Sequence, residues 1–272
     1  MSVAERVEAR EATVQSHRRL SYAVSDAWQL TKRNLLKYTR VPTLLVFSTI
    51  QPITFVLLFR YVFGNAIRGT GGVSYVDFLM PGVFVQTVVF GSTQTGIGLA
   101  EDLSKGLIDR FRSLPMARSA VLAGRTISDL CRNLFVLLLM TGVGVLVGFR
   151  FHAGVVPSLA ALGMALLFAF AFSWISALIG LSIRDVEATQ AASFVWIFPL
   201  VFASSAFVPI QQMPGWLQAW AKVNPVSVTV DTVRALVLGM PVWTHLWKSL
   251  AWISGFLLVF APMAVRRYRK IQ

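Results

Sequence analysis

The chain is poor in charge, in cysteine and in catalytic motifs. Of its 272 residues, 14% are charged and 56% are hydrophobic, whereas soluble domains carry about 25% charge. Most of the chain is therefore expected to lie in lipid. The formal net charge of +13 does not indicate a nucleic-acid partner, because the basic residues follow the membrane topology described below. The lone Cys131 cannot form an internal disulfide.

The usual catalytic and cofactor motifs are missing. There is no GxxxxGK[ST] phosphate-binding loop, no CxxC and no HExxH, so we expect no nucleotide, metal or other cofactor in this chain. The histidines, His17, His152 and His245, lie far apart in the sequence. No Asp or Glu falls in the middle of a predicted span, which argues against coupling to protons or sodium ions and against an intramembrane hydrolase.

Apolar segments predict an all-α polytopic membrane protein, because a span needs about 20 apolar residues. Six candidate spans are found, at about 43–63, 77–100, 129–149, 156–183, 188–208 and 246–265. Most of the 25 Lys and Arg residues lie in the N-terminal segment, in the segment 101–132 and in a basic tail at 266–272. We therefore expect both termini in the cytoplasm. The polar start of the chain does not have the apolar core of a cleavable signal peptide.

The segment before the first span divides into two parts. Residues 1–20 are charged and show no apolar period, which indicates a disordered cytoplasmic tail. Residues 21–40 predict an amphipathic helix on the cytoplasmic leaflet, with Trp28 on its apolar face and Lys32 and Arg33 reaching the lipid phosphates. The alternative is an ordinary basic flank of the first span.

A charged island, Glu101–Arg118, lies between the second and third spans and has the sequence EDLSKGLIDRFRSLPMAR. Four of its residues recur at helical spacing and form one apolar face: Leu103, Leu107, Phe111 and Leu114. Glu101 and Lys105 can pair at i,i+4, and Pro115 ends the helix. A short amphipathic cytoplasmic helix of this kind suits docking onto a soluble partner.

The region before the last span does not fit a plain helical hairpin. Ala188–Ala221 is uncharged and interrupted by prolines, too long for one span and too short for two. We expect two half-submerged or re-entrant outer helices, at Met213–Lys222 and 226–239, with Asp231 and Arg234 able to pair at i,i+3. The alternative is a flexible outer loop. Four tryptophans fit an interfacial aromatic belt on this side: Trp216, Trp220, Trp243 and Trp247.

A few polar or amphipathic residues fall inside the predicted spans: Gln51, Gln86, Gln94 and Trp174. Interhelical hydrogen bonding is the common use of such residues in lipid. The alternative is that they line a pathway for an amphipathic substrate. Glycines of the second and third spans are expected to allow close helix packing; these are Gly91, Gly96, Gly98, Gly142, Gly144 and Gly148.

Three stretches together carry a family resemblance. The first is the island, with Glu101, Gly106, Arg110, Arg112 and Leu114-Pro115. The second is the outer region Phe207–Gly239, with Pro214-Gly215-Trp216-Leu217, Asn224-Pro225 and Asp231…Arg234. The third is the layout of six spans preceded by a basic interfacial helix. In these features the chain resembles the membrane permeases of ABC-2-type exporters, in particular the daunorubicin-resistance-like group of bacterial drug and lipid exporters.

The resemblance implies a transport subunit without enzyme activity of its own. The chain would be half of a pore, completed by a second copy or a close paralogue, and each half would bind a separate ATPase subunit that holds ATP and magnesium. The island would be the coupling helix that contacts this ATPase, through Glu101, Gly106, Arg110, Phe111, Arg112, Leu114 and Pro115. The N-terminal helix around Trp28 would help to hold the ATPase. The outer gate would contain Pro214, Trp216, Asn224, Pro225, Asp231 and Arg234.

The expected function is therefore export of an amphipathic drug-like or lipid substrate across a bacterial plasma membrane. Two alternatives remain open from the sequence. One is an importer permease, and the other is a membrane-embedded lipid-processing enzyme or scaffold.

Overall fold

The computed structural model describes residues 43–63, 74–106 and 118–270, together with residues 28, 29, 31, 32, 34 and 36 of the N-terminal segment. This part of the chain is helical and contains no strand, as predicted. Four helices are long and apolar enough to cross a membrane: α3 (Tyr75–Ser104), α5 (Arg118–Val147), α6 (Val155–Ile183) and α10 (Trp243–Lys270). Two shorter apolar helices are α2 (Thr43–Leu58), which continues into a π-helical turn at Phe59–Phe63, and α7 (Val186–Phe202).

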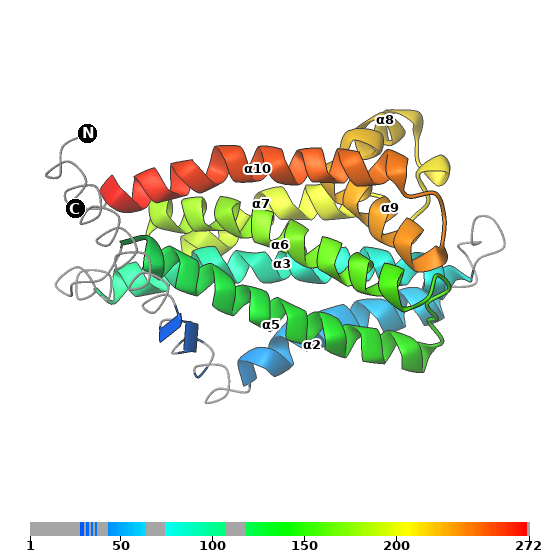
Figure 1. The fold of residues 1–272 in the computed structure, drawn as a ribbon, viewed down its shortest axis with the longest axis horizontal. Coiled ribbons are helices and arrows are strands. Elements are labelled where there is room, and N and C mark those ends of the chain that lie inside the picture. Colours follow the sequence, from blue (N-terminus) through cyan, green and yellow to red (C-terminus); the bar gives the residue numbers. More distant parts are fainter. Residues whose placement is uncertain are drawn as a thin grey trace, which may run out of the picture.

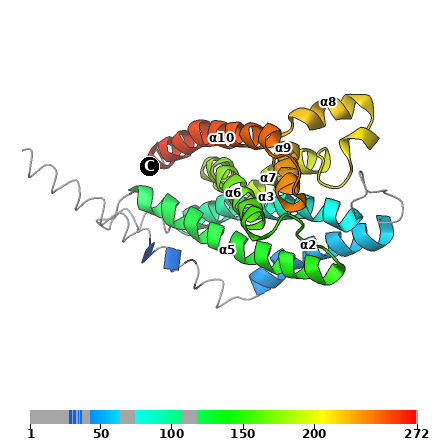
Figure 2. The ribbon, with the colours of Figure 1, turned by 45° about the vertical axis from the view of Figure 1, so that its right-hand side comes forward.

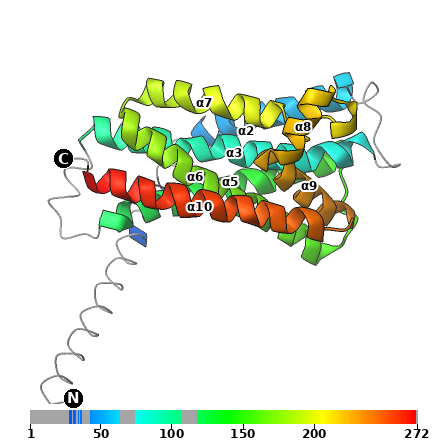
Figure 3. The same ribbon diagram turned by 90° about the horizontal axis from the view of Figure 1, so that it is seen from above.

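The helices lie side by side in an elongated bundle, with α3 and α6 near its centre (Figure 1). α3 is the most buried of the long helices. Its main neighbours are α6, α5 and α7, while α10 and α9 cover α6. Figure 3 shows α7 and α10 on opposite sides of the bundle. The largest buried side chains come mainly from the central helices: Leu79, Met80, Phe84, Leu137, Met140, Phe168 and Phe172.

Glycine allows α3 and α6 to approach closely. A Cβ atom at Gly180 would overlap the backbone of Gly96, and a Cβ at Gly96 would overlap the backbone of Ser176. The predicted role of glycine in helix packing is confirmed for four of the expected positions, where an added Cβ would meet a neighbouring side chain or backbone: Gly91, Gly96, Gly98 and Gly144. It is wrong for Gly142 and Gly148, because nothing lies within 4 Å of a Cβ placed there.

The two ends of the bundle differ. One end, called the terminal end below, holds the end of α3, the start of α5, the α6–α7 turn and the end of α10 (Figure 1). The opposite end holds α8 (Gly215–Val223), α9 (Pro225–Leu238) and the short 3-10 turn Ile210–Gln212. Figure 2 shows α8 and α9 together at this α8–α9 end. Both segments predicted to form outer helices are helical, with bounds close to those predicted.

Local sequence sets several helix ends. The Ser74 hydroxyl accepts a hydrogen bond from the backbone N–H of Asp77 and begins α3. At α9, Asn224 is the N-cap and Pro225 occupies the first helical position, where its missing N–H costs nothing. Gly239, with φ of 73°, ends α9 in the left-handed conformation that glycine adopts readily.

Two helices at the centre of the chain have bounds that differ from those of the predicted spans. α5 begins at Arg118, before the predicted span at 129–149, so Arg125 belongs to the same helix as Asp129 and Arg132. Hydropathy did not indicate the first turns of α5 because they carry charged residues. α7 ends at Phe202 rather than 208, shortly after Pro199. Proline hinders continuation of a helix, and the chain turns here to approach α9.

At the terminal end, two helices extend beyond the predicted spans. α10 continues to Lys270, so most residues of the predicted basic tail are helical. α3 runs past the predicted limit of 100 to Ser104 and includes the start of the island. Gly106 then has a φ of +64°, so α3 ends before it; Leu107, Phe111 and Leu114 of the predicted apolar face lie outside the described residues. The predicted tail at residues 1–20 lies outside the described residues.

Candidate functional site

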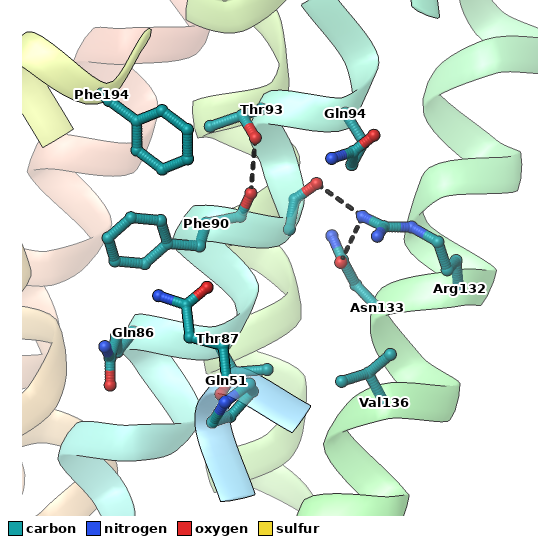
Figure 4. Close-up of a pocket in the computed structure, with 12 residues that line it drawn as sticks. Gln51, Gln86, Thr87, Phe90, Thr93, Gln94, Arg132, Asn133, Val136 and Phe194 are labelled. Carbon is teal, nitrogen blue, oxygen red and sulfur yellow. Dashed lines mark hydrogen bonds between the residues drawn. The ribbon is translucent and has the colours of Figure 1, made fainter. Parts of the chain in front are cut away.

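A cavity of about 100 Å³ lies beside the middle of α3, between α2, α5 and α7 (Figure 4). It is lined by Gln51, Pro52, Gln86, Thr87, Phe90, Gly91, Thr93, Gln94, Arg132, Asn133, Val136 and Phe194. Gln51, Gln86 and Gln94, which the sequence predicted as pathway candidates, therefore meet in one place. Trp174 does not join them. It packs near the terminal end beside the apolar cluster of Leu99 and Leu181.

Polar atoms in the wall of this central cavity are buried without partners. Gln86 and Thr87 are 2% and 7% exposed. Within the part of the chain that the structure describes, Gln86 Oε1 and Thr87 Oγ1 make no hydrogen bond. A buried polar atom without a partner is costly. Both side chains line the cavity, so their rotation would bring these atoms to a hydrogen-bonding molecule that enters it, and the Thr87 hydroxyl can donate as well as accept.

Arg132 places a positive charge at the opposite wall. It is buried on α5, and its Nη2 donates to the Gly91 carbonyl at 2.5 Å and to Asn133 Oδ1 at 3.0 Å (Figure 4). A Cβ at Gly91 would overlap the Asn133 side chain, so glycine on α3 makes room for this contact. Among the described residues that line the cavity, Arg132 alone carries a charge and no acid is present.

A buried ionic cluster continues from the cavity towards the terminal end. The Thr95 hydroxyl donates to Asp129 Oδ2 at 2.7 Å, and Arg125 Nε lies 3.4 Å from the same oxygen. Arg125 also donates to the Gln94 carbonyl at 3.1 Å and lies 4.0 Å from Asp102. These contacts bind α5 to α3 from the middle of the bundle to its terminal end.

The sequence analysis missed this cluster. It assigned Arg125 and Arg132 to a cytoplasmic loop and found no acid deep in a span, whereas Asp129 is 1% exposed within α5. A signal was available, because Arg125, Asp129 and Arg132 are spaced i, i+4 and i+7 and so share one helical face. Hydropathy averaged over a window of residues does not show this spacing.

At the α8–α9 end, a second buried network is centred on Arg234. The predicted pair is confirmed, since Arg234 Nη1 donates to Asp231 Oδ1 at 2.7 Å. The same guanidinium donates to the carbonyls of Phe78 at 3.1 Å and Ser205 at 2.8 Å. Its carbon lies 3.8 Å from the centre of the Phe78 ring, which adds a cation–π contact. The Arg234 side chain thus connects α9 to α3 and to the segment that follows α7.

The other residues of the predicted outer gate are dispersed around this network. Asn224 is buried, and its Nδ2 donates to the carbonyls of Leu200 at 2.7 Å and Ala203 at 3.1 Å, so it connects α9 to the end of α7. Pro214 precedes α8, and Trp216 is 75% exposed. The tryptophans of the predicted belt are all substantially exposed: Trp216, Trp220, Trp243 and Trp247.

A second and larger cavity, of about 640 Å³, lies beside Asp231 and Arg234. Its wall is mostly apolar and includes Phe78 and Met240, with Gln211 and His245 as polar members. It is separate from the central cavity, since the two share no lining residue.

The described part of the island forms the end of α3. Lys105 Nζ donates to Glu101 Oε1 at 2.6 Å, which confirms the predicted i,i+4 pair. This hydrogen bond raises the pKa of the Lys105 amine above its usual value. Gly106 is the last described residue before the gap. The remaining residues predicted to contact an ATPase, Arg110, Phe111, Arg112, Leu114 and Pro115, lie outside the described residues.

The described residues of the N-terminal segment are helical and touch α5. The buried Thr31 hydroxyl donates to the Gly124 carbonyl at 3.2 Å, and Asn34 Nδ2 lies 3.4 Å from Ser128 Oγ. Trp28 and Lys32 are exposed. This arrangement is compatible with the predicted interfacial helix and adds a face that docks on the bundle. Arg33 lies outside the described residues.

These features define a multi-pass helical membrane protein whose buried polar groups gather at a central cavity and at one end of the bundle. The sequence profile of the ABC-2 type transporter family matches residues 25–238, and the chain belongs to this family. The resemblance found in the sequence is therefore confirmed.

Named relatives agree with this assignment. The chain is similar to daunorubicin resistance ABC transporter permease protein DrrB1 of Streptomyces coeruleorubidus, with 35% identity over 247 residues that cover 91% of this chain and 87% of the relative. It is 28% identical to the probable doxorubicin resistance permease DrrC of Mycobacterium tuberculosis, over 86% of this chain and 85% of that protein. Identity to the inner membrane transport permease YadH of Escherichia coli is 23%, over 78% and 85% of the two chains.

Proposed function

We propose that this chain is the membrane-spanning subunit of an ATP-driven exporter that moves an amphipathic drug-like or lipid molecule outward across the plasma membrane. The central cavity carries this proposal, because it places polar groups without partners beside the middle of α3, at the depth where a substrate would cross. The names of the relatives, which refer to daunorubicin and doxorubicin resistance, support a drug-like substrate.

The proposed topology has six spans. α2 with its π-helical turn covers 43–63, and α7 at 17 residues reaches about 25 Å. Both come close to the hydrocarbon thickness of about 30 Å, and they join the four longer helices. The basic residues at the end of α10 favour a cytoplasmic terminal end, and exposed Trp216 and Trp243 favour an outer interface at the α8–α9 end.

A second copy or a paralogue is proposed to cover the side of the bundle that carries α2 and α7. Gln51 and Gln94 line the central cavity and are exposed on this side. Lipid tails cannot form hydrogen bonds with the side-chain amides of these glutamines, whereas another protein surface or an enclosed pathway can. Two central cavities facing each other would form one pathway between the subunits.

The energy is proposed to come from a separate ATPase that binds at the terminal end. The sequence has no phosphate-binding loop, and the island begins at this end with Glu101 and Lys105 exposed enough to meet a partner. The ionic cluster of Asp102, Arg125 and Asp129 then connects this end to the wall of the central cavity. Movement of the island can reach the cavity through these contacts.

Affinity purification of the tagged chain from its native cell tests the proposal. In mild detergent we expect a stoichiometric ATPase subunit, identified by mass spectrometry. Charge reversal of Arg110 and Arg112 should remove this ATPase, while charge reversal of Lys222, on exposed α8 at the other end, should leave it bound. Absence of any ATPase, even after chemical crosslinking, would contradict the proposed function and favour an enzyme or a scaffold.

Substitution of Gly106 is expected to impair transport without preventing membrane insertion. The positive φ of Gly106 costs a β-branched residue about 1–2 kcal/mol, so Gly106→Val should displace the turn that leads into the island. We expect efflux of a fluorescent amphipathic dye from cells to fall about tenfold, the factor that corresponds to this energy. Gly142→Val is the matched control, because its Cβ would meet nothing within 4 Å in helix α5. Equal efflux by the two variants would contradict the expectation.

A further inference from the structure

We infer that the central cavity selects an uncharged, hydroxyl-bearing head group of an amphiphile whose flat ring system lies against the aromatic side chains of α7. This inference rests on the proposed function and specifies its substrate class. It combines the charge of the cavity wall, the buried atoms without partners, the size of the cavity and the row of rings at its mouth.

The charge of the wall disfavours a cationic head group. Arg132 lines the cavity and none of the described lining residues is an acid. The nearby carboxylate of Asp129 already accepts a hydrogen bond from Thr95 and faces Arg125. An ammonium group entering the cavity would meet a like charge and lose its hydration without gaining a carboxylate.

The buried polar atoms favour a hydroxyl. Gln86 Oε1 needs a donor, and Thr87 Oγ1 can donate or accept; within the described residues neither atom has a partner. A hydroxyl both donates and accepts, so a hydroxyl in the cavity can form a hydrogen bond with either of these side chains of α3. A purely apolar group in this place would leave both atoms without a hydrogen bond.

The cavity accommodates a head group and not a whole drug-sized molecule. Its volume is about 100 Å³. Binding sites for drug-sized ligands occupy about 300–1,000 Å³. The remainder of the substrate must therefore lie outside the cavity, at its mouth.

Aromatic side chains continue from the mouth along α7. Phe90 and Phe194 line the cavity with their ring centres 5.9 Å apart. From there the ring centres of Phe194 and Phe198 are 5.5 Å apart, and those of Phe198 and Phe202 are 5.3 Å apart and stacked. Phe198 and Phe202 remain 43% and 40% exposed. Such rings offer favourable stacking contacts to a flat aromatic body, in the direction of the α8–α9 end.

A set of probes with one ring system and different heads tests the inference. The purified full-length chain in lipid nanodiscs is titrated with pyrenemethanol, with pyrenemethylamine, which is cationic at neutral pH, and with unsubstituted pyrene. Binding is followed by fluorescence, and partitioning into empty nanodiscs is subtracted. We expect pyrenemethanol to bind about tenfold more tightly than the other two, the factor for roughly one net hydrogen bond.

Variants assign the selectivity to the cavity. Gln86→Leu and Thr87→Val should each weaken pyrenemethanol binding severalfold and leave pyrene binding unchanged, which also shows that the variants are folded. Phe194→Leu should weaken binding of all three probes alike. Gln211→Leu, in the larger cavity at the α8–α9 end, is the control and should change nothing. Equal affinity for the alcohol and the amine, or pyrenemethanol binding that is insensitive to Gln86→Leu and Thr87→Val, would overturn the inference.

The probe experiment and the purification experiment test different claims, and either can give a negative result without the other. Binding is measured on the permease chain alone, so it does not depend on an ATPase. If an ATPase co-purifies but the three probes bind equally well, the proposed substrate class is refuted and the proposed function stands. If pyrenemethanol binds selectively but no ATPase co-purifies, the proposed function is refuted and the head-group selectivity of the cavity stands.

Discussion

Replacing Arg234 with leucine is expected to lower the free energy of unfolding by about 3–5 kcal/mol. Arg234 is 8% exposed and contacts three separate parts of the chain: Asp231 on its own helix, the Phe78 carbonyl on α3 and the Ser205 carbonyl after α7. Leucine would leave two carbonyls and a partly buried carboxylate, which also accepts a hydrogen bond from the Ser205 hydroxyl, without the guanidinium donor. Unfolding by sodium dodecyl sulfate in mixed micelles, followed by tryptophan fluorescence, measures the change.

Two further variants make the test of Arg234 specific. Arg234→Lys retains the charge, but an ammonium does not have the planar fork of a guanidinium, so its loss of stability should be intermediate. Lys222→Leu removes an exposed cation at the same end of the bundle, and it should change stability by no more than about 0.5 kcal/mol. A loss for Arg234→Leu as small as that for Lys222→Leu would show that the network does not hold the α8–α9 end together.

Two alanine substitutions on α6 are expected to have opposite effects. Gly180→Ala should destabilise the bundle by about 1–3 kcal/mol, the usual cost of overpacking, because its Cβ would overlap the backbone of Gly96 on α3. Neither backbone can move without separating the two central helices. Gly163→Ala lies on the same helix, and a Cβ there meets nothing within 4 Å. It should be neutral or stabilising by up to about 1 kcal/mol, since alanine favours the helix.

The same pair of variants links packing to transport. α3 carries Gln86 and Thr87 of the central cavity, so separation of α3 from α6 should displace both side chains. We expect Gly180→Ala to reduce dye efflux in cells while Gly163→Ala retains it, at equal levels of membrane protein. If the two variants unfold at the same detergent concentration, close contact between α3 and α6 does not contribute to stability.

The sequence predicted much of the fold because the relevant signals are local. Runs of apolar residues indicated the helices that now appear as α2, α3, α5, α6, α7 and α10. Prolines and Asn224-Pro225 indicated the break between α8 and α9, and the spacing of Asp231 and Arg234 indicated their pair. Each of these features depends on residues within a few turns of one another.

The errors arose where a residue's environment is set by another helix. Hydropathy placed Arg125 in a loop before the predicted span at 129–149, but glycine on α3 makes room for this side chain: a Cβ at Gly98 would overlap the Arg125 guanidinium. Trp174 was grouped with the pathway residues by chemistry alone, although its face of α6 points to a different cluster. Gly106 was placed inside a continuous helix, because spacing alone does not reveal a left-handed turn.

The sequence by itself determined that this protein is a helical membrane protein of the ABC-2 type, since composition, apolar runs and ordered motifs are properties of the chain alone. Only the tertiary structure decided which polar residues act together. It brought Gln51, Gln86 and Gln94 to one cavity and placed Arg132 in its wall. The physical reason is that a buried polar group needs hydrogen-bond partners, and these partners come from helices far apart in the sequence.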